Sequence, residues 1–203
     1  MKTEIDPKIV KKLREETGAG MMNCKKALAE NDGNYEKAVE SLKLKGMVTA
    51  DKKANRNTNE GMIYSYIHTG NKLGIMVEVN CETDFVARRQ EFNELAKNIA
   101  MQIASNPEIE VVSYSDISES IKQKLWNFES IKEDLQNKPE QIRNKIVEGR
   151  VEKSLKKQVL LEQEYIRDPN LTVNDYIKQV ISILGENIRI TRFVRFVLGE
   201  TDK

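Results

Sequence analysis

The sequence predicts an α+β fold: a three-helix bundle, then a three-stranded antiparallel sheet packed with helices that include a helical hairpin. Helical spacing of apolar residues fills residues 1–50, and alternation of apolar and polar residues marks 61–80 and the stretch from Ile188 to Leu198. Long runs of helical spacing lie between these stretches. We expect residues 1–50 to form a helical domain, 51–60 a linker, and 61–203 an α+β core domain.

The first domain contains signals for the ends of three short helices. Asp6-Pro7 predicts a helix start, because a carboxylate that caps the helix precedes proline at the first helical position. Gly18 ends this helix, the second helix ends near Gly33, and Asn34 caps the third. The expected apolar faces are Ile9, Val10 and Leu13, then Cys24, Ala27 and Leu28, and then Tyr35, Ala38, Val39 and Leu42.

Two adjacent methionines begin the second helix. Neighbouring side chains on a helix diverge by about 100°, so Met21 and Met22 cannot both face one core. Methionine suits surfaces that adapt to a partner. The alternative is that both side chains fill gaps beneath the Gly18-Ala19-Gly20 turn.

Residues 51–60 are polar and without apolar periodicity, which is typical of a linker. Residues 61–80 then predict a β-hairpin whose turn is Thr69–Lys72. Its first strand places Ile63 and Ile67 on one face, and its second strand alternates through Leu73, Ile75, Val77 and Val79.

The segment Thr83-Asp84-Phe85 joins this hairpin to the next helix. We expect Thr83 and Asp84 to cap the first free amides of that helix. A large aromatic residue beside a carboxylate at such a junction is placed to point outside the domain. The alternative is that Phe85 folds back as a hydrophobic staple on its own helix.

The remaining chain reads as helices followed by one strand. One long amphipathic helix is predicted through Ile117, Ile121, Leu125, Phe128, Ile131 and Leu135. Lys138-Pro139 breaks it, and a second helix toward Leu160 completes a hairpin, whose alternative use is a protein-binding arm. Thr172 caps a helix that Gly185 closes. The last strand is expected to place Ile188, Ile190, Val194, Phe196 and Leu198 on one face and Arg189, Thr191 and Arg195 on the other.

Composition argues against several classes of protein. The 33 Lys and Arg residues against 32 Asp and Glu give no basic excess, so we expect no direct binding of nucleic acid. Nothing in this sequence resembles a signal peptide, and no apolar run approaches the roughly 20 residues that span a bilayer. We therefore expect an intracellular protein without a membrane partner.

We expect neither catalysis nor a bound cofactor. His68 is the only histidine, and Cys24 and Cys81 lack the spacing of metal ligands, so no metal site is predicted. Asn23 stands where a dinucleotide fingerprint needs its third glycine, and no phosphate-binding loop occurs. The chain is not expected to bind GTP itself.

Three stretches resemble one known family. Thr83-Asp84-Phe85-Val86, with Asn80 before it and Phe92 after it, resembles the signature of bacterial and organellar translation elongation factor Ts. The runs from Leu13 to Leu28 and from Leu184 to Glu200 are similar to the same family, so the resemblance covers essentially the whole chain.

The resemblance implies a guanine-nucleotide exchange factor, not an enzyme, acting on GDP-bound and nucleotide-free elongation factor Tu. It implies that Thr83, Asp84, Phe85 and Val86 dislodge the Mg²⁺ beside the partner's nucleotide. It also implies a ubiquitin-associated-like amino-terminal domain in which Arg14, Met21 and Met22 contact the partner's GTP-binding domain. The expected location is the cytoplasm or an organelle interior such as the plastid stroma.

Long members of that family carry a second half-domain that resembles the first, and this sequence has one set of strands. A two-fold homodimer would supply the missing half. Two other functions stay open on the sequence alone. One is an adaptor that binds another chain through residues 1–50, and the other is a ribosome- or RNA-associated protein using the lysine-rich helices between Lys122 and Lys157.

Overall fold

The computed structural model describes residues 5–136 and 138–200. Two compact units divide the chain. The first contains the residues up to Tyr64, Glu78–Lys97 and Asp175–Ile190, and the second contains Ser65–Val77, Asn98–Asn174 and the chain from Thr191 on. The predicted division into 1–50, 51–60 and 61–203 follows sequence segments and stays a prediction.

The amino-terminal bundle consists of α1 (Pro7–Thr17), α2 (Met21–Glu30) and α3 (Tyr35–Lys53), which pack against one another. The Asp6 carboxylate accepts the Lys8 amide at 2.8 Å, and Asn34 caps α3, so both predicted starts are confirmed. Gly18, with φ of 67°, ends α1. The buried core is Val10, Leu13, Cys24, Ala27, Leu28, Ala38 and Leu42. Helix α3 continues three residues beyond position 50.

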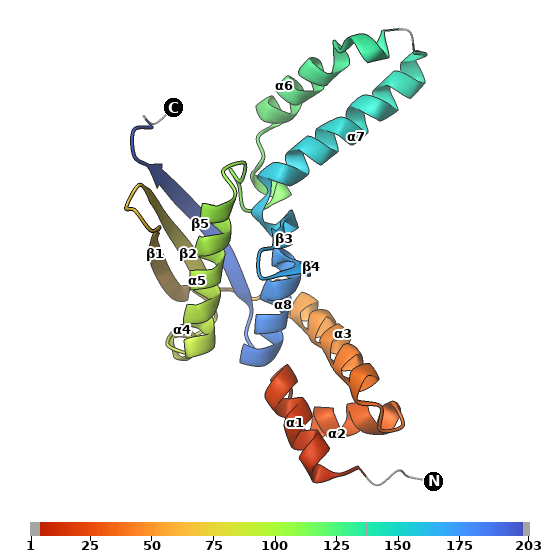
Figure 1. Ribbon diagram of the computed structural model, residues 1–203, viewed down its shortest axis with the longest axis vertical. Helices are drawn as coiled ribbons and strands as arrows, with labels where there is room; N and C mark the ends of the chain where they lie inside the picture. The colour runs from red at the N-terminus through yellow and green to blue at the C-terminus, as the bar shows by residue number, and fades with distance from the viewer. Residues whose placement is uncertain (1–4, 137, 201–203) are drawn as a thin grey trace. The chain divides into compact units, whose positions relative to one another are not determined.

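A three-stranded antiparallel sheet follows, with strand order β1-β2-β5. Its strands are β1 (Glu60–Ile67), β2 (Leu73–Cys81) and β5 (Ile188–Val197). The predicted hairpin is confirmed, and its turn uses Gly70 and Asn71, both with positive φ. Ile75, Val77, Val79 and Cys81 alternate along β2 and are all buried, and the helix α5 (Gln90–Ser105) follows (Figure 1).

The prediction of one continuous apolar face on β5 is wrong. Ile188 and Ile190 are buried, but Thr191 and Arg192 are both exposed, and the alternation shifts by one residue there. The later apolar residues Val194, Phe196 and Leu198 are consequently exposed. Arg195 takes the inward position because its guanidinium donates to the carbonyls of Ile103 (2.6 Å), Asn106 (2.6 Å) and Pro107 (2.8 Å) at the end of α5.

The predicted helical hairpin is present and is formed by α6 (Glu119–Ser130) and α7 (Glu140–Gln158), which run side by side (Figure 1). The single helix expected through Leu135 is wrong, because α6 ends at Ser130 and a 3₁₀ turn, η2 (Glu133–Leu135), follows. Leu135 turns inward there while Phe128 and Ile131 are exposed. The hairpin core contains Ile117, Leu135, Val147, Val151, Leu155 and Val159.

Charged side chains on the hairpin pair with one another. Lys132 donates to Glu129, and Arg150 reaches both Glu129 and Asp134. These carboxylates lie among the basic side chains and interrupt the continuous basic stripe that would favour binding to nucleic acid.

The remaining elements connect the hairpin to the last strand. They are η1 (Tyr114–Asp116), η3 (Leu160–Glu162), β3 (Glu164–Tyr165), β4 (Asp168–Thr172) and α8 (Val173–Leu184). Strands β3 and β4 pair antiparallel in a small second sheet that the sequence did not predict.

Candidate functional site

The most exposed aromatic side chain lies at the junction singled out in the sequence. The short helix α4 (Asp84–Ala87) follows β2 directly, and its Val86 and Ala87 are buried. Phe85 between them is 81% exposed. A staple packed on its own helix would be shielded from solvent, so that alternative is wrong. The junction holds its inner residues in the core and directs Phe85 outward.

The predicted cap of this helix by the Thr83 side chain is also wrong. Thr83 stands at the capping position, but its side chain binds no amide of α4. Its hydroxyl donates instead to Oε1 of Glu186 at 2.6 Å, and its backbone amide donates to Oε2 at 3.0 Å. An ionised carboxylate is a stronger acceptor than a neutral group. Asp84, the other predicted cap, pairs with Arg88 at 2.9 Å.

Cys81 supports the same segment from the core side. Its thiol is buried and lies 3.1 Å from the Thr83 carbonyl oxygen, to which it donates. Burial raises the pKa of the Cys81 thiol to about 11, and the nearby Glu186 carboxylate adds to this effect. The thiol therefore stays protonated at neutral pH and keeps its hydrogen bond.

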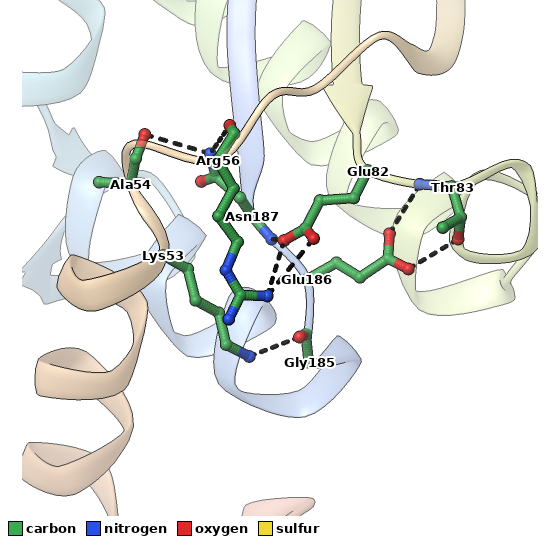
Figure 2. A network of polar contacts seen from close by, with 8 residues as sticks. All are labelled: Lys53, Ala54, Arg56, Glu82, Thr83, Gly185, Glu186 and Asn187. Atoms are coloured by element: carbon green, nitrogen blue, oxygen red, sulfur yellow. Dashed lines mark hydrogen bonds and ion pairs between the residues drawn. The ribbon is translucent and has the colours of Figure 1, made fainter.

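A polar network surrounds Glu82 and Asn187, next to this segment (Figure 2). Asn187 is only 5% exposed, and its backbone amide donates to Oε1 of Glu82 at 2.6 Å. Its side-chain amide donates to the carbonyls of Ala54 (3.2 Å) and Arg56 (2.9 Å). Arg56 in turn lies 3.4 Å from the Glu82 carboxylate.

Sequence reasoning assigned no role to Glu82, Glu186 or Asn187. The sequence shows only that Glu186 and Asn187 lie between Gly185, which ends a helix, and an apolar strand. Polar residues at such a place commonly form a turn and nothing more. The contacts of Glu186 with Thr83 join residues more than a hundred positions apart, which local patterns do not reveal.

The second group of predicted site residues lies around the turn between α1 and α2. Arg14 is exposed in the last turn of α1, and Met21 and Met22 are the first residues of α2. Met21 is 43% and Met22 75% exposed, so the alternative in which both fill core gaps is wrong. The structure thus places the predicted residues in two groups on separate elements, α4 and the α1–α2 turn.

Within the described residues, no group of three or more His, Cys, Asp and Glu side chains is arranged to hold a metal ion. The helices of that same part of the chain include none long and apolar enough to cross a membrane.

Comparison with known proteins places the chain in a family. Residues 4–200 match the family model described as "Elongation factor TS". The chain belongs to the elongation factor Ts family. The match covers both groups of candidate residues and the network around Asn187, and it confirms the resemblance seen in the sequence.

Relatives in this family are similar along nearly the whole chain. The chloroplastic elongation factor Ts of Phaeodactylum tricornutum is 76% identical over 202 residues, and 100% of each chain is covered. The chloroplastic elongation factor Ts of Rhodomonas salina is 57% identical, with 98% of this chain and 91% of the relative covered. The elongation factor Ts of Synechococcus elongatus is also 57% identical, with 97% and 89% covered.

Proposed function

We propose that this chain is a guanine-nucleotide exchange factor for elongation factor Tu, promotes GDP release by disturbing the partner's Mg²⁺ and phosphate site, and lets GTP reload. Membership of the elongation factor Ts family supports the partner. The observation that carries the mechanism is the exposure of Phe85 on a short helix whose neighbouring residues are buried. An exposed apolar side chain on a fixed base suits insertion into another protein.

The mechanism needs no covalent chemistry. GDP is held in a GTPase by phosphate contacts and by a Mg²⁺ that neutralises phosphate charge. Phe85 inserts as a wedge beside that ion and favours a partner conformation in which the Mg²⁺ shell is broken. GDP then binds more weakly. Because coupling between ligands is reciprocal, returning GTP and Mg²⁺ displace the factor.

The four residues from Thr83 to Val86 divide this work. Val86 is buried and anchors α4, so it acts through the fold and not by touching the partner. Thr83 is held by Glu186. Asp84 keeps a half-exposed carboxylate beside Phe85, paired with Arg88. Phe85 is the contacting residue, with Asp84 as its charged neighbour.

The partner's GTP-binding domain is held in position by contacts with Arg14, Met21 and Met22. Exposed methionines supply adaptable apolar area, and Arg14 adds a charge at the other end of the same turn. The working place we propose is the plastid stroma, or the cytoplasm in the bacterial case, since the relatives named above are chloroplastic or cyanobacterial.

The test is release of a fluorescent GDP from purified elongation factor Tu at millimolar Mg²⁺. Substoichiometric amounts of this protein are expected to accelerate release. Burying a Phe side chain contributes about 1.5–3 kcal/mol, so Phe85→Ala should lower kcat/KM by about ten- to a hundredfold. Phe128→Ala is the matched control, because Phe128 is also exposed but lies on the hairpin.

Each result has a clear meaning. Acceleration by the wild-type chain that Phe85→Ala lowers by this factor, while Phe128→Ala does not, supports the wedge. Binding without acceleration leaves an adaptor, and a well-folded Phe85→Ala variant with wild-type exchange removes the wedge mechanism. No binding to elongation factor Tu removes the proposed function altogether.

We also propose that the chain pairs with a second copy through the open face of its sheet. In the second unit this face exposes Ile67, Met76, Phe196 and Leu198, with the last two 61% and 74% exposed. Contiguous exposed apolar residues mark interaction surfaces. A hollow of about 520 Å³ lies on the same face beside Gly74.

The shape of this face favours self-pairing. A side chain at Gly74 would stand 3.1 Å from Ile67 and 4.0 Å from Phe196, so the glycine lets the Ile67 side chain lie close over the strand. In a two-fold dimer each copy presents the same patch, and Phe196 and Leu198 of one copy can fill the hollow of the other.

Sedimentation velocity tests this pairing. The wild-type chain should sediment as a dimer and Phe196→Glu as a monomer, because the added charge would be buried without a partner. Ile131→Glu, a change at an exposed apolar residue of the hairpin, should remain dimeric. A wild-type monomer at micromolar concentration would exclude the homodimer.

A further inference from the structure

Two loops of the first unit are joined by hydrogen bonds that run in both directions. Glu82 and Thr83 follow β2, and Glu186 and Asn187 precede β5. The Glu186 carboxylate accepts the backbone amide of Thr83, and the Glu82 carboxylate accepts the backbone amide of Asn187. Each glutamate therefore fixes the residue next to the other glutamate, as Figure 2 shows.

The hydrogen bonds made by Glu186 act on the residue from which α4 begins. Thr83 is the residue immediately before α4, and both its amide and its hydroxyl are bound by the two oxygens of one carboxylate. Two bonds to one planar group fix orientation as well as position. Phe85 is two residues further on, so a rotation of Thr83 would redirect the exposed ring.

Asn187 connects these two loops to the segment that follows α3. The Asn187 side chain donates to the carbonyls of Ala54 and Arg56, and Lys53 donates to the Gly185 carbonyl. Nearby, Asp51 of α3 pairs with Lys178 of α8 at 2.7 Å. The loop that holds Thr83 is thus itself held by the end of α3 and the chain after it.

We propose that Glu186 is a positioning residue for nucleotide exchange: it fixes Thr83 and thereby the direction in which Phe85 is presented to the partner. Glu186 is needed for the rate of exchange through Phe85, and Asn187 keeps the Glu186 loop in place. This role rests on the proposed function, since it matters only if Phe85 acts on elongation factor Tu.

The test measures kcat and KM for GDP release by the full chain, by the control Asp134→Ala, and by four variants of the site: Glu186→Ala, Glu186→Gln, Phe85→Ala and the double variant Glu186→Ala/Phe85→Ala. Glu186→Ala should lower kcat about tenfold, the effect of losing about one bond to a charged group, and change KM less than about twofold. Glu186→Gln should restore most of kcat, because an amide can accept from the Thr83 amide and donate to the Thr83 hydroxyl.

The double variant asks whether Glu186 acts through Phe85. If it does, Glu186→Ala/Phe85→Ala is no slower than Phe85→Ala alone. Amide hydrogen exchange gives an independent readout: the Thr83 amide should lose protection in Glu186→Ala and keep it in Glu186→Gln. The Val79 amide in β2 reports on the sheet and should remain protected in both. Asp134→Ala removes a paired carboxylate from the hairpin and should accelerate GDP release as the wild type does.

Several outcomes would overturn the positioning role. They are a wild-type kcat in Glu186→Ala, no rescue by Glu186→Gln, and a double variant whose loss is the product of the two single losses. If Phe85→Ala is impaired while Glu186→Ala is not, the positioning role fails and the proposed function stands. If Phe85→Ala itself behaves as wild type, the wedge and this role fail together.

Discussion

Gly61 at the start of β1 lies directly against the backbone of Val79 on β2. A side-chain carbon at Gly61 would stand 2.1 Å from the Val79 carbonyl oxygen, and the Gly61 φ of 146° is one that other residues rarely adopt. Only glycine permits this approach of the two strands.

Gly61→Ala should therefore destabilise the protein by about 2–4 kcal/mol, through the clash and the strained backbone. Urea unfolding followed by circular dichroism measures the loss. Gly149→Ala is the matched control, because Gly149 lies in α7 with no atom near a new side chain. It should stabilise the chain by about 0.5–1 kcal/mol. Equal stability of Gly61→Ala and wild type would contradict the close approach.

Substituting Met21 or Met22 by Ala should weaken binding of elongation factor Tu without weakening the fold. Both side chains are exposed, so each loses contact with a partner and little core packing. We expect each substitution to raise Kd about tenfold. This corresponds to losing roughly half of the free energy that burying such a side chain contributes. Titration calorimetry measures Kd, and thermal unfolding supplies the control. A lower midpoint with unchanged Kd would instead indicate a packing role.

Cys81 should contribute to the pH dependence of stability at alkaline pH. Its pKa is raised from 9.0 to about 11, chiefly by burial, so the folded protein favours the protonated thiol. This contribution is complete below pH 9 and is lost as the pH rises toward 11, since the unfolded chain releases the proton first.

The measurement is the difference in free energy of unfolding between wild type and Cys81→Ala at several pH values. The difference should fall by about 2 kcal/mol between pH 8 and 11. Iodoacetamide should not label Cys81 in the folded protein at pH 8. Rapid labelling under native conditions would show that the thiol is accessible and the pKa is not raised.

Arg195→Ala should destabilise the protein by about 2–4 kcal/mol. The guanidinium donates to three carbonyls at the end of α5, and truncation leaves these acceptors without that donor. Burial lowers the pKa of Arg195, but the group stays charged at neutral pH. Arg195→Lys should recover part of the loss, because an ammonium group cannot span all three acceptors. Arg189→Ala, at an exposed position of β5, is the control and should change stability by less than about 0.5 kcal/mol.

Much of the fold follows from local rules that the sequence displays. Asp6 and Asn34 begin helices where capping chemistry predicts, and the alternation through Ile75, Val77 and Val79 places those residues in the core. Neighbours along the chain determine such features. The exposure of Phe85 and the methionines was one of two alternatives, and the structure decides between them.

The predictions that failed have other causes. Thr83 does not cap α4 because a carboxylate from a distant loop binds its hydroxyl. The face of β5 changes at Thr191 and Arg192, and Arg195 turns inward toward carbonyls of α5. Strands β3 and β4 are too short for alternation to be visible. For Thr83 and Arg195 the deciding contact joins residues far apart in sequence, which periodicity cannot report.

The bond between Thr83 and Glu186 also bears on the order in which the protein matures on the ribosome. Synthesis runs from the amino terminus, so α4 and Phe85 leave the ribosome long before the carboxylate that holds their base. Contacts of such high sequence separation form late, after the costly closure of the intervening loop. In the nascent chain Thr83 and Phe85 are therefore present while Thr83 still lacks its partner, and Thr83 is fixed only after the chain through Glu186 has been made.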